Sequence, residues 1–252
     1  MHVTLKNVSK IFTDDAAPLS ALASTTLDIT SGEFICLIGP SGCGKSTLLR
    51  LLADQISPTT GNICLDESPP AQARVRKNIA WMAQNPALLP WQTVLDNIAL
   101  PLRVNRQHQR PAPAPVTLLD MVGLSDFATV RPATLSGGMQ QRVALARALA
   151  TGASLWLMDE PFAALDELTR ESLTHDVLRL WVHFRPTVLW VTHNIAESVR
   201  LADRVIVMTE RPGRIRDIIP IACPRPRDSI APDAIALIRR LRARLGGQHD
   251  DV

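Results

Sequence analysis

Residues 36–50 read CLIGPSGCGKSTLLR, and this stretch decides the fold. The apolar run Phe34–Ile38 predicts a short buried strand, which Gly39 ends, and we expect an apolar helix over about Thr47–Ala53. Between strand and helix, residues 39–46 fit the pattern G-x-x-x-x-G-K-[ST] without a substitution. A strand, a glycine loop and a helix in this order predict a phosphate-binding loop.

The residues of the loop explain why it binds phosphate. Glycine allows successive backbone N–H groups to turn inward around an anion, and the following helix adds its positive N-terminal end. Lys45 can reach the terminal phosphates as a point charge, and the Ser46 hydroxyl can ligate Mg²⁺. The residues expected to contact the nucleotide here are Gly39, Pro40, Ser41, Gly42, Cys43, Gly44, Lys45, Ser46 and Thr47.

Length and composition bound the remaining possibilities. A chain of 252 residues suits one large α/β domain or a core with a subdomain, and 46% hydrophobic residues exclude a disordered chain. A net charge of +3 gives no case for nucleic acid as a partner. The sequence predicts no membrane span, and a first segment without an apolar signal region predicts a cytosolic chain. The four cysteines form no C-x-x-C pair, so reduced thiols are expected.

Apolar periodicity gives a coarse element order. Alternating residues predict edge strands at 3–8 and 25–30, and short strands are expected at 61–67 and 78–83. From about 86 to 150 the pattern is helical and interrupted by prolines. The expected elements there and beyond are a loop at 105–115, a helix at 116–122, strands at 154–158, 187–192, 205–209 and 215–220, and helices at 165–183, 195–201 and 233–245.

Two carboxylates follow the apolar strand Leu155–Met158. Asp159 at the strand end can hold Mg²⁺, directly or through water, and Glu160 can polarise a water for in-line attack on a γ-phosphate. A strand that ends in Asp-Glu is also an ordinary solvated start of a loop. The upstream phosphate-binding loop favours the catalytic interpretation, because it needs such an acid.

A second glycine motif precedes an Ala/Leu-rich helix at Val143–Ala150. Residues 135–142 read LSGGMQQR, in which Ser136 can cap a helix while Gly137 and Gly138 leave its N-terminus accessible to an anion. An ordinary capped helix is the alternative. A second phosphate site is redundant within one subunit, but it is useful if it serves the nucleotide of another subunit.

These motifs together resemble the ATP-binding cassette (ABC) proteins over nearly the whole chain. LSGGMQQR is similar to the signature sequence of that family, beside GPSGCGKST and LWLMDEP. The resemblance implies that Gln84 is the Q-loop glutamine beside the metal and the reacting phosphate, that Asp166 belongs to the D-loop at the nucleotide, and that His193 touches the γ-phosphate. Phe12 resembles the aromatic residue that stacks on adenine, although a core phenylalanine at a strand end is the alternative.

The resemblance also implies a fold and a domain plan. We expect an α/β fold: a P-loop NTPase core with a mostly parallel sheet and an antiparallel edge sheet, plus an inserted α-helical subdomain. The ABC ATP-binding domain would cover residues 1–220, with the helical subdomain at about 86–150. A basic tail and helix would follow at 221–252, either facing anionic lipid or packed on the core with a solvated face.

Finer features resemble the importer ATPases of the nitrate, sulfonate and taurine type. These are residues 84–91, QNPALLPW, the segment AALDELTRESL after Phe162, and ERPGRI at 210–215. Two positions depart from that pattern: Asn194 stands where Asp is usual, and Ala163 where Gly is usual. Neither departure removes a catalytic group.

The resemblance therefore implies an ATPase of a bacterial-type importer that binds ATP and Mg²⁺. Two copies would pair head to tail, each ATP lying between Lys45, Ser46 and Glu160 of one chain and Ser136–Gly138 of the other. The permease would dock near Leu89–Trp91, with a separate solute-binding protein acting through it, at the cytoplasmic side of the cell membrane. A core position for Trp91 is the alternative. Soluble ABC ATPases of DNA repair or translation, nucleotide kinases, GTPases and exporter halves are the alternatives.

Overall fold

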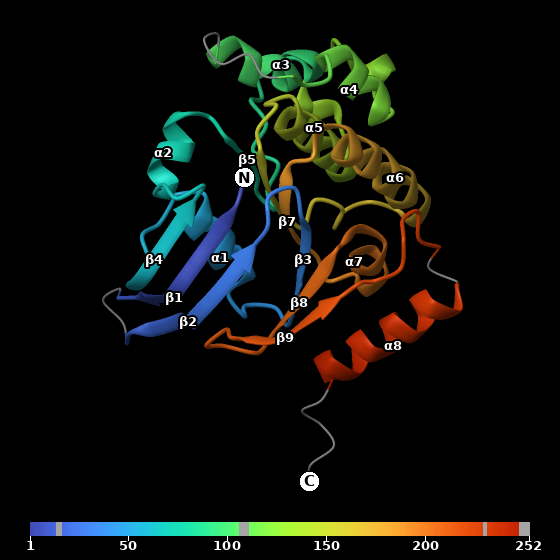
Figure 1. Ribbon diagram of the computed structural model, residues 1–252. Coiled ribbons are helices and arrows are strands. Elements are labelled where there is room, and N and C mark those ends of the chain that lie inside the picture. The colour runs from blue at the N-terminus through green and yellow to red at the C-terminus, as the bar shows by residue number, and fades with distance from the viewer. Residues whose placement is uncertain (14–16, 106–110, 229–230, 247–252) are drawn as a thin grey trace. The chain divides into compact units, whose positions relative to one another are not determined.

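The computed structural model describes residues 1–13, 17–105, 111–228 and 231–246 (Figure 1). Residues 106–110 of the loop predicted at 105–115 and residues 247–252 of the predicted tail lie outside this described part. The chain divides into two units. The first unit comprises Met1–Ala71 and Thr187–Val252, and the second comprises Gln72–Pro186.

The first unit contains an antiparallel sheet in the order β2-β1-β4, made of β1 (Val3–Phe12), β2 (Leu19–Ile29) and β4 (Thr60–Leu65). The predicted edge sheet is therefore confirmed, but β1 is longer than the expected strand at 3–8. Asn7 adopts a left-handed φ of 52°, and the register with β2 shifts between Leu5 and Val8. This irregularity breaks the alternation of apolar residues, which hides the continuation of the strand from sequence analysis.

A second sheet of this unit runs in the order β7-β3-β8-β9. Strands β3 (Phe34–Ile38), β7 (Thr187–Val191) and β8 (Arg204–Met208) are parallel, and β9 (Ile215–Pro220) is antiparallel to β8. All residues of β3 and β7 are buried. Their unbroken apolar sequences are thus explained by coverage of both sheet faces, as predicted.

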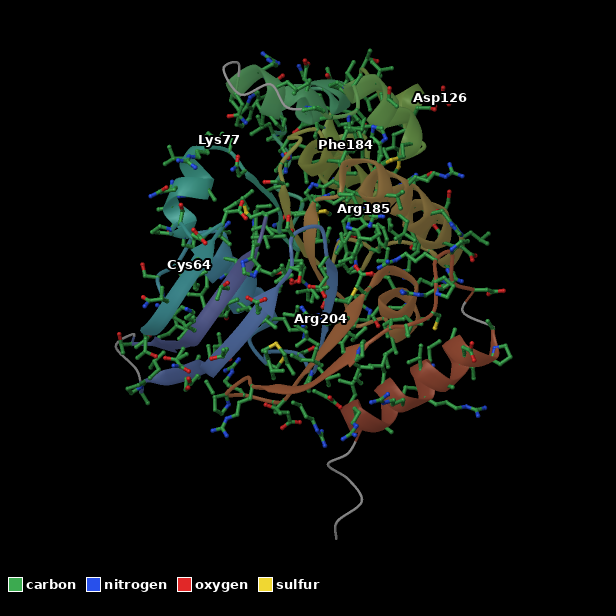
Figure 2. All side chains as sticks on the ribbon, viewed as in Figure 1. Cys64, Lys77, Asp126, Phe184, Arg185 and Arg204 are labelled. Atoms are coloured by element: carbon green, nitrogen blue, oxygen red, sulfur yellow. The ribbon has the colours of Figure 1, made fainter. Side chains whose placement is uncertain are left out.

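An ion pair ties this sheet to the turn before β3. The Arg204 guanidinium, labelled in Figure 2, donates from Nη2 to Glu33 Oε2 at 2.8 Å and to the carbonyl oxygen of Asp28 at 2.8 Å. The hydrogen bonds and charge of Glu33 raise the pKa of Arg204. The start of β8 is thereby fixed to the ends of two other segments of the first unit.

Among the described residues, the helices that lie wholly or partly in the first unit are α1 (Lys45–Leu52), α2 (Pro70–Val75), α7 (Ile195–Leu201) and α8 (Pro232–Gly246). Helix α1 begins at Lys45, two residues before the predicted start, because Gly44 adopts a left-handed φ of 99° and acts as its N-cap. Helix α2 was not predicted. It is short, and its first residue is a proline, which is compatible with a helix only in the first turn.

In the second unit, β5 (Ile79–Met82) and β6 (Leu155–Asp159) form a parallel pair. The helices of this unit are α3 (Val94–Val104), α4 (Pro115–Met121), α5 (Gly137–Leu149) and α6 (Glu167–Phe184), with 3₁₀ turns at Ser125–Phe127 and Pro132–Thr134. Helix α5 begins at Gly137, six residues before the predicted Val143. Its polar first turns are helical because Ser136 caps them, with its Oγ accepting from the Met139 N–H at 3.3 Å.

No helix in the described residues has both the length and the apolar character needed to cross a membrane.

Two arginines of the basic tail bind backbone instead of facing solvent or lipid. Arg227 donates to the carbonyl oxygens of Cys223 (2.7 Å), Val199 (2.9 Å), Ala202 (2.5 Å) and Ile221 (3.1 Å). Val199 and Ala202 lie at the C-terminal end of α7, where carbonyl groups carry negative partial charge. Burial, followed by the charge of Arg225, lowers the pKa of Arg227 to about 10, so the side chain stays protonated at neutral pH.

The neighbouring Arg225 repeats the arrangement. Its guanidinium donates from Nε to the Leu201 carbonyl oxygen at 3.1 Å and from Nη1 to Asp203 Oδ1 at 2.6 Å. Of the two alternatives for the tail, the one in which it faces anionic lipid does not fit either arginine, because both guanidinium groups are bound within the chain. By contrast, Arg239, Arg240, Arg242 and Arg244 on α8 are exposed, as the alternative of a solvated helix face expects.

Arg227→Met should lower the free energy of unfolding by about 2 kcal/mol, because carbonyl groups at the end of α7 lose charged hydrogen-bond donors. The matched control is Arg240→Met on the exposed face of α8, which should change stability by less than about 0.5 kcal/mol. Urea unfolding followed by circular dichroism measures both changes. Equal stability of the two variants would contradict this assignment.

Candidate functional site

The predicted phosphate-binding loop connects β3 to α1 in the first unit. Lys45 is only 7% exposed, and its ammonium donates to the carbonyl oxygens of Gly39 and Pro40, each at 2.8 Å. Ser41 and Gly42 are exposed, whereas Ser46 and Thr47 are half-buried. The loop thus holds a buried cation beside a rim that solvent and ligands can reach.

Neighbouring backbone packs closely against this loop. A Cβ atom on Gly44 would lie 2.6 Å from the carbonyl oxygen of Ala21 in β2, and one on Gly213 would lie 1.8 Å from the carbonyl oxygen of Cys43. The Gly213 N–H also donates to the Ala21 carbonyl oxygen at 3.2 Å. Arg211 Nε donates to the carbonyl oxygen of Gly42 at 3.2 Å. The segment around 211–213 therefore supports the loop directly.

Sequence reasoning missed this support. It used ERPGRI at 210–215 only as part of a resemblance, although an Arg-Pro-Gly turn between two strands is a visible signal. A glycine at 213 is needed because the Cys43 carbonyl oxygen leaves no space for a side chain.

His193 lies at the same edge of the sheet as the phosphate-binding loop. Leu37 of β3 pairs with Val191 of the parallel strand β7, and the Thr192 N–H donates to the Leu37 carbonyl oxygen at 3.2 Å. His193 is exposed and comes two residues after Val191, just as Gly39 comes two residues after Leu37. The carboxyl ends of two adjacent parallel strands thus bring this histidine and the loop to one edge.

Phe12 is the last residue of β1 and is half-buried. The Lys10 ammonium lies 5.1 Å from the centre of its ring, at cation–π distance. The residue is therefore neither a core phenylalanine nor fully exposed, and its role toward adenine remains a prediction.

In the second unit, the carboxyl ends of two adjacent parallel strands likewise bring Gln84 to the same sheet edge as Asp159 and Glu160. Met82 of β5 pairs with Met158 of β6, so Gln84 and Glu160 each come two residues after a paired position. Gln84 is exposed, Asp159 is 5% exposed and Glu160 is half-buried. Glu160 adopts a left-handed φ of 49°, which is unusual for a residue with a side chain.

The glycine motif forms the start of α5. Ser136 and Gly137 are exposed and Gly138 is half-buried. A Cβ on Gly137 would meet no atom within 4 Å, whereas one on Gly138 would lie 2.8 Å from the Ala164 carbonyl oxygen. The exposed side of this helix end is accessible to a partner, and its other side packs on the segment after Glu160.

Asp166 has a local structural role as the N-cap of α6. Its carboxylate accepts from the Thr169 N–H at 2.9 Å and from the Thr169 hydroxyl at 2.7 Å. These hydrogen bonds, the backbone one first, lower the pKa of Asp166. Arg170 Nη2 then binds the Leu165 carbonyl oxygen at 2.8 Å, which fixes the residue before the cap.

The two departures from the importer pattern fit their local surroundings. Asn194 caps α7, because its Oδ1 accepts from the Glu197 N–H at 3.0 Å, as an aspartate would. The Ala163 N–H donates to the Glu160 carbonyl oxygen at 3.1 Å within the turn after β6. The helix cap at position 194 therefore does not require Asp, and the turn at position 163 forms without Gly.

The predicted magnesium ligands have suitable chemistry. Ser46 offers a half-buried hydroxyl in the first unit, and Asp159 offers a buried carboxylate in the second. Both are oxygen ligands, and Mg²⁺ uses few protein ligands while keeping several waters. Among the residues that the structure describes, no group of three or more His, Cys, Asp and Glu forms a metal cluster. The Ser46 hydroxyl and the Asp159 carboxylate are each of the ligand type that Mg²⁺ accepts beside phosphate oxygens.

Comparison with known proteins identifies the family. Residues 22–163 match the family described as ABC transporter. The chain is 42% identical over 225 residues to the nitrate import ATP-binding protein NrtD of Synechococcus elongatus, covering 88% of this chain and 81% of that protein. It is 40% identical over 237 residues to the bicarbonate transport ATP-binding protein CmpD of Synechocystis sp., covering 92% and 83%.

The solved structures agree. A dimeric structure of the ATP-binding cassette MJ0796 in a post-hydrolysis state with ADP and Pi superposes with a TM-score of 0.78 at 33% identity, covering 88% of this chain and 99% of that one. The expected α/β fold of a P-loop NTPase is thereby confirmed. With a matched family, relatives at 40% and 42% identity and a matched cassette fold, this chain belongs to the ABC transporter family as an ATP-hydrolysing cassette.

Proposed function

We propose that this chain is the ATPase subunit of an importer for a small solute such as nitrate, bicarbonate, a sulfonate or taurine. The observation that carries the proposal is the phosphate-binding loop, whose Lys45 ammonium is buried among loop carbonyl groups beside an exposed rim. The import of a small solute rests on the names of the relatives NrtD and CmpD. A non-transport ABC ATPase is not favoured by these relatives.

The proposed chemistry divides tasks among the strand ends. The loop residues 39–47 hold the phosphates, with Lys45 neutralising the terminal ones and Ser46 ligating Mg²⁺, which would offset phosphate charge. Glu160 orients the attacking water and accepts its proton, while His193 contacts the γ-phosphate. Asp159 and Gln84 contribute oxygen ligands toward the metal, and Phe12 stacks on adenine.

The partner subunit completes the site in this proposal. Two copies pair head to tail, and Ser136–Gly138 of one chain bind the phosphates held by the loop of the other, with Asp166 nearby. The exposure of Ser136 and Gly137 supports this role, as does the dimeric state of the related MJ0796 cassettes. An exposed, capped helix start is suited to binding an anion from outside the chain.

The loop after Gln84 is the proposed docking site for a separate permease. Trp91 is 66% exposed on this loop. Arg147 of α5 donates to the carbonyl oxygens of Pro86 at 2.6 Å and Ala87 at 3.0 Å. Asn97 of α3, which is fully buried, accepts from the Leu89 N–H at 2.8 Å and donates to its carbonyl oxygen at 3.1 Å. The loop is thus held in shape while its tryptophan faces outward.

In this arrangement the chain sits as a peripheral subunit at the cytoplasmic side of the cell membrane. A separate solute-binding protein delivers the solute to the permease. Selection of the solute lies outside this chain.

Glu160→Gln should lower turnover by about 10²–10⁴-fold, because an amide cannot accept the proton of the attacking water. ATP binding should persist, so size-exclusion chromatography in Mg-ATP should show a long-lived dimer. The matched control is Glu167→Gln, which neutralises an exposed carboxylate on α6 and should keep wild-type turnover. Near wild-type hydrolysis by Glu160→Gln would remove this residue from the catalytic role.

Gly213→Ala should weaken ATP binding, because its Cβ would collide with the Cys43 carbonyl oxygen and shift the phosphate-binding loop. Overpacking of this kind costs about 1–3 kcal/mol. The control is Gly61→Ala, whose Cβ would lie 2.3 Å from the Asn7 carbonyl oxygen in the other sheet. Calorimetric titration and thermal unfolding should show that both variants lose stability and that only Gly213→Ala loses ATP affinity. Equal affinities would contradict the support of the loop by this turn.

Ser136→Arg should abolish hydrolysis while a monomer still binds ATP, because the residue acts on the partner's nucleotide. Mixing it with Lys45→Ala should restore part of the activity, since half-mutant dimers then contain one intact composite site. Steady-state hydrolysis at varied mixing ratios measures the recovery. A Ser136→Arg monomer that cannot bind ATP would show that the motif acts within its own chain.

A further inference from the structure

Gln141 bridges the two ends of the turn that follows strand β6. It lies on α5, and its side chain is 4% exposed. Its Oε1 accepts from the Ala164 N–H at 2.9 Å, and its Nε2 donates to the Glu160 carbonyl oxygen at 3.1 Å. The two contacts need opposite ends of an amide, one acceptor and one donor, so they suit glutamine among the side chains of this length.

The bridged turn has a demanding backbone. Glu160 is in the left-handed region at a φ of 49°, which is unfavourable for a residue with a Cβ. Such a conformation persists only where the surroundings impose it. Two backbone hydrogen bonds help, from Ala163 N–H to the Glu160 carbonyl oxygen at 3.1 Å and from Leu165 N–H to that of Phe162 at 3.2 Å. The Gln141 side chain adds two hydrogen bonds to this turn from outside it.

A second contact shows that α5 packs directly on this turn. The Ala164 carbonyl oxygen lies 2.8 Å from the position that a Cβ on Gly138 would occupy. The amide N–H of the same residue is the one that Gln141 accepts from. Both polar groups of Ala164 thus face the first two turns of the helix that begins after Ser136.

We propose that Gln141 is a positioning residue for hydrolysis: it holds the Glu160 backbone in the conformation that aims the carboxylate at the attacking water. The inference rests on the proposed catalytic role of Glu160. Gln141 itself touches neither ATP nor water in this account. It sets the direction in which Cα–Cβ of Glu160 leaves the end of β6.

Removal of the bridge should affect chemistry more than binding. Gln141→Leu leaves the Ala164 N–H without its acceptor and allows the turn to relax from the left-handed conformation of Glu160. Displacement of a catalytic group by about 1 Å costs up to about 10²-fold in rate. We expect kcat to fall by about 10–100-fold while the KM for ATP stays as in the wild type, because Lys45 and its loop are untouched.

A double-mutant cycle separates positioning from general damage. If Gln141 acts through Glu160, Gln141→Leu should lower the single-turnover rate of the wild type by about 10–100-fold but change that of Glu160→Gln by less than about twofold, because the group that it positions is already disabled. The matched comparison is Gln140→Leu. The neighbouring Gln140 Nε2 also donates to two backbone carbonyl oxygens, of Pro132 at 3.0 Å and Leu135 at 3.3 Å, before Ser136. Its effect should be the same in both backgrounds.

A conservative variant tests the hydrogen bonds themselves. Gln141→Glu can accept from the Ala164 N–H, but it donates to the Glu160 carbonyl oxygen only when protonated. Burial and that facing oxygen should raise the pKa of the new carboxyl group. The turnover of Gln141→Glu, divided by that of the wild type at each pH, should rise by up to about tenfold per pH unit as pH falls toward this pKa. Gln141→Leu should show a flat ratio.

The outcomes are distinguishable. Three results for Gln141→Leu would overturn the positioning role while leaving Glu160 as the base. They are turnover at the wild-type rate, an effect confined to KM, and an equal loss of rate in the wild-type and Glu160→Gln backgrounds. Wild-type turnover by Glu160→Gln would instead overturn the catalytic role of Glu160, on which this inference rests. If Gln141→Leu fails to unfold cooperatively, the pH ratio of Gln141→Glu decides, and a flat ratio counts against the proposal.

Discussion

The phosphate-binding loop depends on backbone approaching backbone where a side chain has no space. Gly44 faces the Ala21 carbonyl oxygen, and the Cys43 carbonyl oxygen faces Gly213. These approaches connect three distant segments of the first unit at one point. They keep the Lys45 ammonium within 2.8 Å of two carbonyl oxygens, so a buried charge is stabilised by dipoles that are already fixed. The entropy lost in ordering these groups is therefore part of folding and does not weaken ligand binding.

Much of this arrangement could be predicted from the sequence, because it follows from local pattern. The apolar runs at Phe34–Ile38 and Thr187–Val191 are strands buried on both faces, and such strands read as continuous hydrophobic segments. Parallel strands present their carboxyl ends at one edge, which explains how His193 comes to the loop's edge from about 150 residues away. The pairing of β5 with β6 does the same for Gln84 and Glu160.

Other features of the structure could not be predicted, because the sequence pattern does not show which groups they contact. Arg227 looked like a solvated basic residue, but its acceptors are backbone carbonyl groups, which every residue carries and no sequence marks. Gln141 lay inside a recognised motif, which hid its contact with a turn 19 residues further on. The early start of α5 was missed because glycines at 137 and 138 disfavour a helix locally, whereas the Ser136 cap and the close packing at Gly138 favour it.

The left-handed backbone of Glu160 has a consequence for the evolution of such a chain. Glycine and asparagine adopt this region at lower cost than glutamate, so either residue at 160 would make the folded state more stable. On the catalytic role proposed for the carboxylate, the same exchange would end hydrolysis. Selection for heat resistance alone would therefore favour replacement of Glu160 and lead to an inactive protein. The chain keeps a residue that its backbone disfavours, which is the pattern expected where fitness is set by turnover and not by stability.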